Sequence, residues 1–371
     1  MKETVLITGG AGFIGSHLAD ALALEGHKIK ILDNLAPPVH NDEWPKYSIN
    51  KGYELIKGDV TKKEDLEKSL IDVDAVYHLA AHQDQLSNFS KFFDTNTKST
   101  ALIYEIINEK KLPIKKVVYS SSQFIYGDGF YENSEGEMFM PELRSLEQLK
   151  KHQWEILDSH GKSTKFIPFK ENQKPNPTNS YGLSKMASEN LALTLGKQLN
   201  IPTSIVRYSI VQGPRQSPTN IYSGALRIFV TQALAGLPIT VYEDGHQTRD
   251  FVNIKDVTKA NLLMLKDKKT DFEIFNVGGG KVHTILDFAR KVKEITNSNS
   301  KINVWGEFRK TDTRNAVSDI SKLTGLGWKP ESSASISIRD YADWFLSEGY
   351  NPKEIAFGAN DKLKKLGVTD S

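Results

Sequence analysis

The chain has 371 residues, of which 39% are hydrophobic and 25% are charged, and its formal net charge is +2. This composition is typical of a globular protein, and the nearly balanced charge gives no electrostatic reason to expect nucleic acid or a membrane surface as a partner. Cysteine is absent, which excludes disulfides, thiol nucleophiles and cysteine-ligated metal centres, and we expect no metal. The N-terminal segment lacks a signal-peptide pattern and no stretch reaches the roughly 18 apolar residues needed to cross a bilayer, so we expect a cytoplasmic protein.

Short apolar runs alternate with segments of helical periodicity through the first 212 residues. Six runs predict strands: Thr4–Thr8, Lys28–Leu32, Glu54–Ile56, Ala75–His78, Lys116–Tyr119 and Thr203–Tyr208. Four segments predict helices: Phe13–Leu24, Lys62–Leu70, Ser99–Asn108 and Tyr181–Leu199. This alternation is typical of an α/β fold with a doubly wound parallel sheet of the Rossmann type. We therefore expect residues 1–212 to form one such domain.

Two stretches interrupt the alternation. Residues 36–52 contain three prolines among polar residues, which predicts a loop. Asp128–Asn179 is too long for an ordinary connection, and we expect a lid or small subdomain that closes over the substrate. Without cysteine to hold a metal, this segment should be held together by its own apolar residues: Phe130, Met138, Phe139, Leu146, Leu149 and Trp154. The alternative is a surface insertion that packs far from the site.

The C-terminal part has a looser pattern. From Gly213 onwards glycine and proline are frequent, and only two compact helices are predicted, at Ala225–Ala235 and Thr284–Ile295. We expect residues 213–350 to form mainly a smaller substrate-binding lobe. Asn351–Ser371 is rich in lysine and weakly periodic, which predicts a tail.

A glycine-rich turn joins the first predicted strand to the first predicted helix. Gly9, Gly12 and Gly15 form the pattern G-x-x-G-x-x-G, in which the missing side chains let the backbone approach a pyrophosphate at the positive end of the helix. Tight packing alone could also explain such a turn. Asp33, however, ends the second strand, where its carboxylate can accept the hydroxyls of an adenosine ribose. The two features together predict a dinucleotide cofactor.

Asp33 also indicates which dinucleotide binds. Its charge would repel a 2′-phosphate, and Asn34, the next residue, offers no compensating cation, so we expect NAD and not NADP. Asp59 and Val60 follow the third strand and are predicted to bracket the adenine, while residues 36–52 lie over the adenosine side. The alternative for Asp59 is a turn or N-cap residue of the following helix.

Three serines and a Y-x-x-x-K pattern supply candidate catalytic groups. Ser120, Ser121 and Ser122 follow the fifth strand, at the sheet edge where open α/β folds bind ligands. Tyr181 and Lys185 share one helix face, so both can meet the cofactor ribose, and the ammonium group should lower the phenol's pKa. Ser122 could then hold the reacting hydroxyl. Turn chemistry for the serines and an exposed amphipathic helix for the pattern are the alternatives.

In this order, the motifs resemble those of the extended short-chain dehydrogenase/reductases, specifically their nucleotide-sugar epimerases and dehydratases. The resemblance covers residues 3–345 and rests on ITGGAGFIG, GDV, HLAA, SSSQFIYG, YGLSK, RYSIVQGPRQ, DGHQTRDFVNIKDV, FNVGGG and DTRNAVSDISK. It implies NAD as the cofactor. It also implies further cofactor-binding residues beside those already named: Phe13, Ile14, Leu79, Ala80, Ala81, Asn96, Ser120, Tyr181, Lys185 and Tyr208.

The resemblance further implies a site for the substrate diphosphate. Arg249 and Arg309 would contact it, with Asp312 in the substrate site, because guanidinium groups match phosphate oxygens in a bidentate manner. The alternative is an ion pair of Arg249 with Asp250 or Asp256, and of Arg309 with Asp312. Two histidines stay open: His78 ends a strand and is predicted to be packed, while His82 could approach the sugar.

Gln123 and Phe124 indicate the reaction. Family dehydratases place an acid pair directly after the first catalytic hydroxyl, and related decarboxylases typically have an acidic residue there, whereas these two side chains cannot protonate a leaving group. We therefore expect an NAD-dependent 4-epimerase that acts through a transient 4-keto intermediate on a dTDP- or UDP-activated (deoxy)hexose. The alternatives are a 4-reductase or 4,6-dehydratase of the same family, and a catalytically silent nucleotide-sensing protein.

Within the family, the sequence is most similar to the 4-epimerases of dTDP-6-deoxyhexoses and of UDP-glucose. Two features depart from that pattern. The long insertion often carries paired cysteines in such relatives, and Ile210 stands where epimerases usually have an amide side chain that contacts the diphosphate. The resemblance also implies a homodimer, in which the helices Ser99–Asn108 and Tyr181–Leu199 would pack across a two-fold axis.

Overall fold

The computed structural model describes residues 2–84, 86–220, 224–309 and 312–357. Its main element is a seven-stranded parallel sheet in the order β3-β2-β1-β4-β5-β9-β13. The strands are β1 (Thr4–Thr8), β2 (Lys28–Asp33), β3 (Glu54–Lys57), β4 (Ala75–His78), β5 (Lys116–Ser122), β9 (Thr203–Tyr208) and β13 (Ile274–Val277). The predicted α/β fold with a doubly wound Rossmann-type sheet is confirmed.

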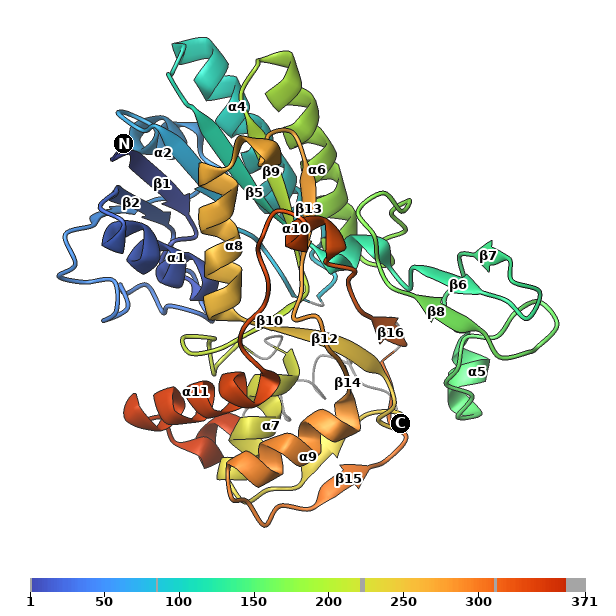
Figure 1. Cartoon of the computed structure of the whole chain (residues 1–371). Helices are drawn as coiled ribbons and strands as arrows, with labels where there is room; N and C mark the ends of the chain where they lie inside the picture. Colours follow the sequence, from blue (N-terminus) through green and yellow to red (C-terminus); the bar gives the residue numbers. More distant parts are fainter. Residues whose placement is uncertain (1, 85, 221–223, 310–311, 358–371) are drawn as a thin grey trace.

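Helices cover both faces of this sheet (Figure 1). One layer contains α1 (Phe13–Leu24) and α8 (Ile254–Lys266), which pack against each other. The other layer contains α2 (Lys63–Ser69), α4 (Ser99–Lys110) and α6 (Ser180–Gln198). Because both faces are covered, the central strands β4 and β5 are buried along their whole length, as expected for apolar strands of a parallel sheet.

The predicted strands and helices of this domain are confirmed to within a few residues, with one extension. The helix expected at Ser99–Asn108 is preceded by α3 (Phe89–Phe92) and a π-helical segment, η1 (Phe93–Lys98). The π-helical segment lies against α6 and buries Asn96. The polar residues of this segment hide its helical character from a search for apolar periodicity.

Two elements beyond residue 213 belong to the main domain. Helix α8 and strand β13 follow that residue in the chain, yet they return to the main sheet and its helical layer. Their apolar residues complete the core on the α1 side: Ile254, Val257, Ala260, Met264, Phe275 and Val277. The smaller C-terminal lobe is therefore built from segments on either side of this return.

This C-terminal lobe combines short strands with three larger helices around an aromatic and aliphatic core. Its strands are β10 (Ile210–Gln212), β11 (Ile239–Val241), β12 (Thr248–Asn253), β14 (Val282–Thr284), β15 (Ile302–Val304) and β16 (Asn315–Ala316). Its helices are α7 (Gly224–Leu234), α9 (Ile285–Ile295) and α11 (Ala334–Ser347), whereas α10 (Ser321–Thr324) packs beside β13 of the main sheet. Rings of Phe229, Phe251 and Phe288 lie together at its centre, beside α11. Two short 3-10 turns complete the main body: η2 (Gln123–Tyr126) and η3 (Lys268–Thr270).

The insertion Asp128–Asn179 forms an arm that projects to the side of the body (Figure 1). It contains a three-stranded sheet in the order β7-β6-β8 and one helix: β6 (Phe130–Glu132), β7 (Met138–Phe139), β8 (Lys165–Ile167) and α5 (Leu146–Lys150). Its predicted apolar core is wrong in part. Met138 and Leu146 are exposed, while Leu149 and Trp154 pack on Phe308 of the C-terminal lobe, because the arm is too small to bury large side chains by itself.

No helix among the described residues has the length and apolar character needed to span a bilayer. No group of three or more metal-ligating side chains occurs in the part of the chain that the structure describes. The predicted tail, Asn351–Ser371, lies mostly outside the described residues, which end at Phe357.

Candidate active site

The glycine-rich turn lies between β1 and α1, at the carboxyl edge of the sheet. Gly9 has φ of +69°, and a Cβ atom on Gly15 would lie 2.5 Å from the Gly9 carbonyl oxygen. A Cβ atom on Gly9 would lie 2.8 Å from the backbone of Ala80, at the end of the neighbouring strand. The turn therefore keeps its backbone uncovered next to the start of α1, which is the arrangement a pyrophosphate requires.

Asp33 ends β2 directly beside this turn. Its carboxylate accepts hydrogen bonds from the backbone N–H groups of Leu35 (2.9 Å) and Ala11 (3.1 Å), and burial raises its pKa. Phe13 and Ile14, at the start of α1, pack partly buried against the core of that layer. The structure thus brings the glycine turn and Asp33 together, as predicted.

Asp59, Val60 and Asn34 lie at the next strand end. Asp59 accepts hydrogen bonds from the backbone N–H and the hydroxyl of Thr61, both at 2.8 Å, and it therefore acts as a turn residue. Asn34 lies at the limit of hydrogen-bond distance from Asp59, 3.5 Å. The side chain of Val60 belongs to the core beneath α2, so its backbone is the part available to a cofactor.

Hydrogen bonds to β1, to α4 and to the π-helical segment η1 hold the end of β4 and the segment that follows it. His78 lies between the hydroxyls of Thr8 (2.7 Å) and Ser99 (2.8 Å), and burial lowers its pKa to about 3, so it is a neutral packed residue as predicted. Leu79, Ala80 and Ala81 follow it. Asn96 donates to Ser184 in α6 (2.9 Å) and exchanges hydrogen bonds with the backbone of His82. Asn96 thus ties this segment to the helix that carries Tyr181.

The ring of His82 contacts two neighbouring side chains, Asp84 and Phe92. Its Nε2 atom lies 2.9 Å from the carboxylate of Asp84, and its ring lies against Phe92 with the centroids 4.8 Å apart. Burial lowers its pKa, and Asp84 opposes that shift. An approach to the sugar would require His82 to leave these partners.

Ser122, Tyr181 and Lys185 meet where β5 ends and α6 begins. Asn179 caps α6 by accepting a hydrogen bond from Gly182 N–H (2.8 Å), which fixes the first turn that carries Tyr181. The Ser122 hydroxyl faces the phenol of Tyr181 and favours a lower pKa for it. Lys185 donates to the carbonyl of Ser120 (2.7 Å), and its ammonium group lies 6.0 Å from the centre of the Tyr181 ring.

The electrostatics of this set differ from the expectation in one respect. Burial raises the pKa of Tyr181 to about 12, and the Ser122 hydroxyl opposes the rise. Burial lowers the pKa of Lys185 to about 7. The expected lowering of the phenol's pKa by the ammonium group is absent in this geometry, because Lys185 is directed at Ser120 and is itself desolvated. Proton removal by Tyr181 therefore requires additional positive charge at the site.

Tyr208 is not placed as the resemblance implied. Its buried hydroxyl donates to the side chain of Asn261 in α8 (2.8 Å), which directs the ring into the core under the sheet. Gln123, in contrast, lies at the site: it follows Ser122, is almost fully buried, and its Oε1 atom has no hydrogen-bond partner among the described residues. Phe124 lies edge-on to the Tyr181 ring, 5.9 Å between centroids.

The two arginines predicted to bind diphosphate have different surroundings. Arg249 donates to Asp312 Oδ1 (2.9 Å), not to Asp250, which accepts from Ser209 and Gly279, nor to Asp256, which accepts from Ser332. The alternative considered for Arg249, an ion pair with Asp250 or Asp256, is therefore wrong, since side-chain proximity across 63 residues of sequence is set by the fold.

Arg309 does not pair with the side chain of Asp312. Its guanidinium lies over the ring of Tyr242, 4.8 Å from the ring centre, and its Nε atom has no hydrogen-bond partner among the described residues. A buried donor of this kind is satisfied when an anion binds beside it.

Sequence reasoning missed a cluster of buried charged side chains next to these arginines. Arg144 from the insertion, Glu243, and Arg314 form it. Arg314 belongs to the motif DTRNAVSDISK, but Arg144 and Glu243 lie outside the quoted motifs and far away in the chain. No local pattern predicted that the three side chains would meet.

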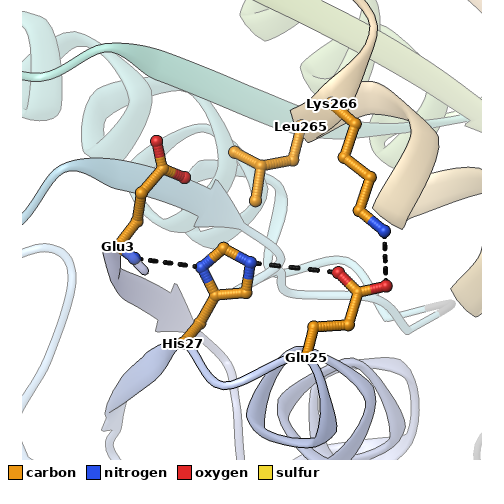
Figure 2. Close-up of a pocket in the computed structure, with 5 residues that line it drawn as sticks. All are labelled: Glu3, Glu25, His27, Leu265 and Lys266. Atoms are coloured by element: carbon orange, nitrogen blue, oxygen red, sulfur yellow. Dashed lines mark hydrogen bonds and ion pairs between the residues drawn. The ribbon is translucent and has the colours of Figure 1, made fainter. Parts of the chain in front are cut away.

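A hollow at the opposite edge of the sheet carries no catalytic set (Figure 2). It lies at the amino ends of β1 and β2, where His27 bridges the backbone N–H of Glu3 and the carboxylate of Glu25. Lys266 also pairs with Glu25. These charges are matched internally, so the carboxyl edge with Ser122 and Tyr181 remains the candidate site.

Comparison with known proteins gives the family. Residues 5–145 and 158–278 match the NAD dependent epimerase/dehydratase family. The chain belongs to this family. The family match shows that NAD is its cofactor, and the glycine turn and Asp33 fit that group, because added side chains would close the turn.

Individual relatives show the range of reactions in the family. The chain is 31% identical to the dTDP-L-rhamnose 4-epimerase of Burkholderia thailandensis, over 93% of this chain and 96% of the relative. It is 29% identical to a UDP-N-acetyl-alpha-D-glucosaminuronate decarboxylase of Bacillus cytotoxicus, over 93% and 98%. The UDP-glucuronic acid 4-epimerase of Bacillus cereus, solved with UDP-glucuronic acid and NAD, superposes with a TM-score of 0.75 at 26% identity, covering 93% of this chain and 99% of that one. This family member is therefore an enzyme that modifies a nucleotide sugar.

Proposed function

We propose that the protein is an NAD-dependent nucleotide-sugar 4-epimerase that acts through a transient 4-keto intermediate on a dTDP- or UDP-activated (deoxy)hexose. The observation that carries this proposal is the set of Ser122, Tyr181 and Lys185 followed by Gln123 and Phe124. The set can move a proton at a sugar hydroxyl. The amide of Gln123 and the phenyl ring of Phe124 cannot protonate a leaving group, as the acid pair of a dehydratase does.

The residues of the chain act on the C4 hydroxyl. Ser122 holds that hydroxyl by a hydrogen bond, and Tyr181, as the phenolate, accepts its proton and becomes the neutral phenol. NAD, held by the glycine turn, Asp33 and Lys185, would supply a reversible hydride acceptor and a positive charge to the site. Lys185, fixed by the Ser120 carbonyl, holds the cofactor ribose next to Tyr181. The proton on Tyr181 returns to the C4 oxygen at the end of the cycle.

The diphosphate is assigned to the two arginines of the C-terminal lobe. Arg309 offers a buried N–H donor. Arg249 lies on β12 and donates a hydrogen bond to Asp312 in the neighbouring segment. Holding the diphosphate alone allows the keto sugar to turn about its linkage and present its other face. Ile210 replaces the amide side chain that epimerases usually have at this position, so the two arginines carry more of this contact.

The proposal is tested by product analysis. The protein is incubated in D₂O with a panel of UDP- and dTDP-sugars, and products are identified by NMR. The expected result is a C4 epimer without deuterium on carbon and without net consumption of NAD, because hydride leaves and returns within the site. A 4,6-dehydratase would introduce solvent deuterium on carbon, a 4-reductase would consume a reduced cofactor, and a sensing protein would give no product. Any of these three results would reject the proposal.

A further inference from the structure

A buried cluster of charges joins the inserted arm to the C-terminal lobe. Arg144, in the arm, donates two parallel hydrogen bonds to the carboxylate of Glu243, at 2.8 and 3.0 Å. Arg314 donates to the same carboxylate at 3.1 Å and also pairs with Asp244 and Glu155. The side chains of Arg144, Glu243 and Arg314 are each less than 5% exposed. Charges that are this deeply buried require complete pairing.

Arg144 uses its remaining donors on backbone carbonyls. Its Nη1 atom donates to the carbonyl of Trp154 (3.0 Å), and its Nη2 atom donates to the carbonyl of Asp312 (2.8 Å). These four hydrogen bonds tie the arm to the C-terminal lobe. The bond to Asp312 holds the segment 312–314 in place.

The same segment is held from the other side by Arg249. The Arg249 guanidinium donates to Asp312 Oδ1 (2.9 Å), to the carbonyl of Thr313 (2.8 Å) and to the carbonyl of Arg314 (3.2 Å). A second residue of the arm, Asp128, accepts from the backbone N–H of Arg314 at 3.1 Å. Segment 312–314 therefore lies between two contacts from the arm and the guanidinium proposed to bind diphosphate.

We propose that Arg144 is a positioning residue for the diphosphate site: through Asp312 it fixes the segment that orients Arg249 and follows Arg309. This inference rests on the proposed assignment of those two arginines. The base of the arm then supports the substrate site from outside. This role differs from that of a lid, which would close over the substrate. The charges facing Arg144 come from the arm (Asp128), from the loop after β11 (Glu243) and from segment 312–314 (Asp312).

The test compares binding of UDP and dTDP, the sugar-free probes, by calorimetry. Arg144→Met removes the bidentate donor, and Arg144→Lys keeps the charge without the planar fork. The matched control is Lys151→Met, in the same arm, whose exposed ammonium pairs with Glu147. We expect Arg144→Met to weaken nucleoside diphosphate binding by about tenfold or more and Arg144→Lys to have an intermediate effect. NAD binding should be unchanged, and KM for the sugar nucleotide should rise much more than kcat falls.

A second variant covers the case in which Arg144→Met fails to fold. Arg144→Met combined with Glu243→Met leaves no unpaired charge at this position, and Arg314 keeps Asp244 and Glu155 as partners. The double variant should fold and should still bind nucleoside diphosphate weakly, because Asp312 has lost its donor. Wild-type affinity in a folded Arg144 variant would overturn the inference.

Arg249→Ala separates this inference from the proposed function. If Arg249→Ala leaves the affinity for UDP and dTDP unchanged, the assignment of the diphosphate site is wrong. If Arg249→Ala weakens both and the Arg144 variants do not, the diphosphate site stands and only the role of Arg144 is rejected.

Discussion

Tyr181 is the residue whose single oxygen atom the proposed reaction uses directly. Tyr181→Phe deletes that oxygen and keeps the ring contact with Phe124. We expect kcat to fall by roughly 10²–10⁴, the usual contribution of a positioned acid or base, with folding and NAD affinity nearly intact. Steady-state rates with the active sugar nucleotide measure this. A variant that keeps more than about a tenth of the wild-type rate would exclude Tyr181 as the essential base.

Lys185 is expected to limit activity at high pH. Burial lowers the pKa of Lys185 to about 7, so its charged form is lost as the pH rises through that value. If the ammonium group is needed, kcat/KM should fall on the alkaline side. Lys185→Arg keeps its charge at all accessible pH values and should move this limb to higher pH. An unchanged alkaline limb in Lys185→Arg would show that Lys185 does not titrate in the working enzyme.

Asp33 is expected to set the choice of cofactor. Asp33→Ser removes the carboxylate beside the glycine turn, which should weaken NAD binding by about tenfold and narrow its advantage over NADP, since the repulsion of a 2′-phosphate is lost. Fluorescence titration with both cofactors measures the two affinities. Asp42→Ser is the control, because Asp42 is exposed on the following loop and pairs with Lys57. Equal wild-type affinities for the two cofactors would refute this role.

At the scale of elements, the strand–turn–helix unit from β1 to α1 depends on close backbone contacts. Gly15→Ala places a Cβ atom 2.5 Å from the Gly9 carbonyl oxygen, so the turn must move. We expect a loss of NAD affinity of at least about tenfold, together with a lower melting temperature. Gly136→Asn is the control: this turn of the arm is open, and asparagine tolerates a positive φ. Normal NAD binding by Gly15→Ala would mean that the turn does not hold the pyrophosphate.

The arm shows how an element can be recognised in the sequence while its role is decided elsewhere. Its boundaries follow from its length and from its position between β5 and α6. Its attachment could not be predicted, because it depends on contacts of Arg144 and Trp154 with residues 99 or more positions away in the chain, Glu243 and Phe308. The lid remains a prediction, and the proposed support at the base of the arm is tested by the Arg144 variants.

At the scale of the whole molecule, the expected homodimer remains a prediction. Helices α4 and α6 pack side by side on one face of the sheet, and the π-helical segment beside α6 exposes Phe93. Exposed aromatic residues of this kind are typical of an interface centre. Phe93→Glu should shift the protein from dimer to monomer in light scattering. Phe357→Glu, an exposed aromatic residue elsewhere, should not, and a wild-type monomer would reject the dimer itself.

The sequence by itself determined the parts of this protein that local physics governs. Apolar runs predicted the strands, because a parallel sheet covered on both faces needs them. The glycine spacing and Asp33 predicted the cofactor site, because few backbones can approach a pyrophosphate. Tyr181 and Lys185 were paired correctly in space because they lie one helical turn apart on α6.

Only the tertiary structure decided which distant side chains meet. It returned α8 and β13 to the main sheet, paired Arg249 with Asp312, and turned the hydroxyl of Tyr208 toward Asn261. It also desolvated Tyr181 and Lys185, which reversed the expected direction of the phenol's shift in pKa. Burial and long-range pairing arise from the packing of segments remote in sequence, and no local pattern of residues encodes them.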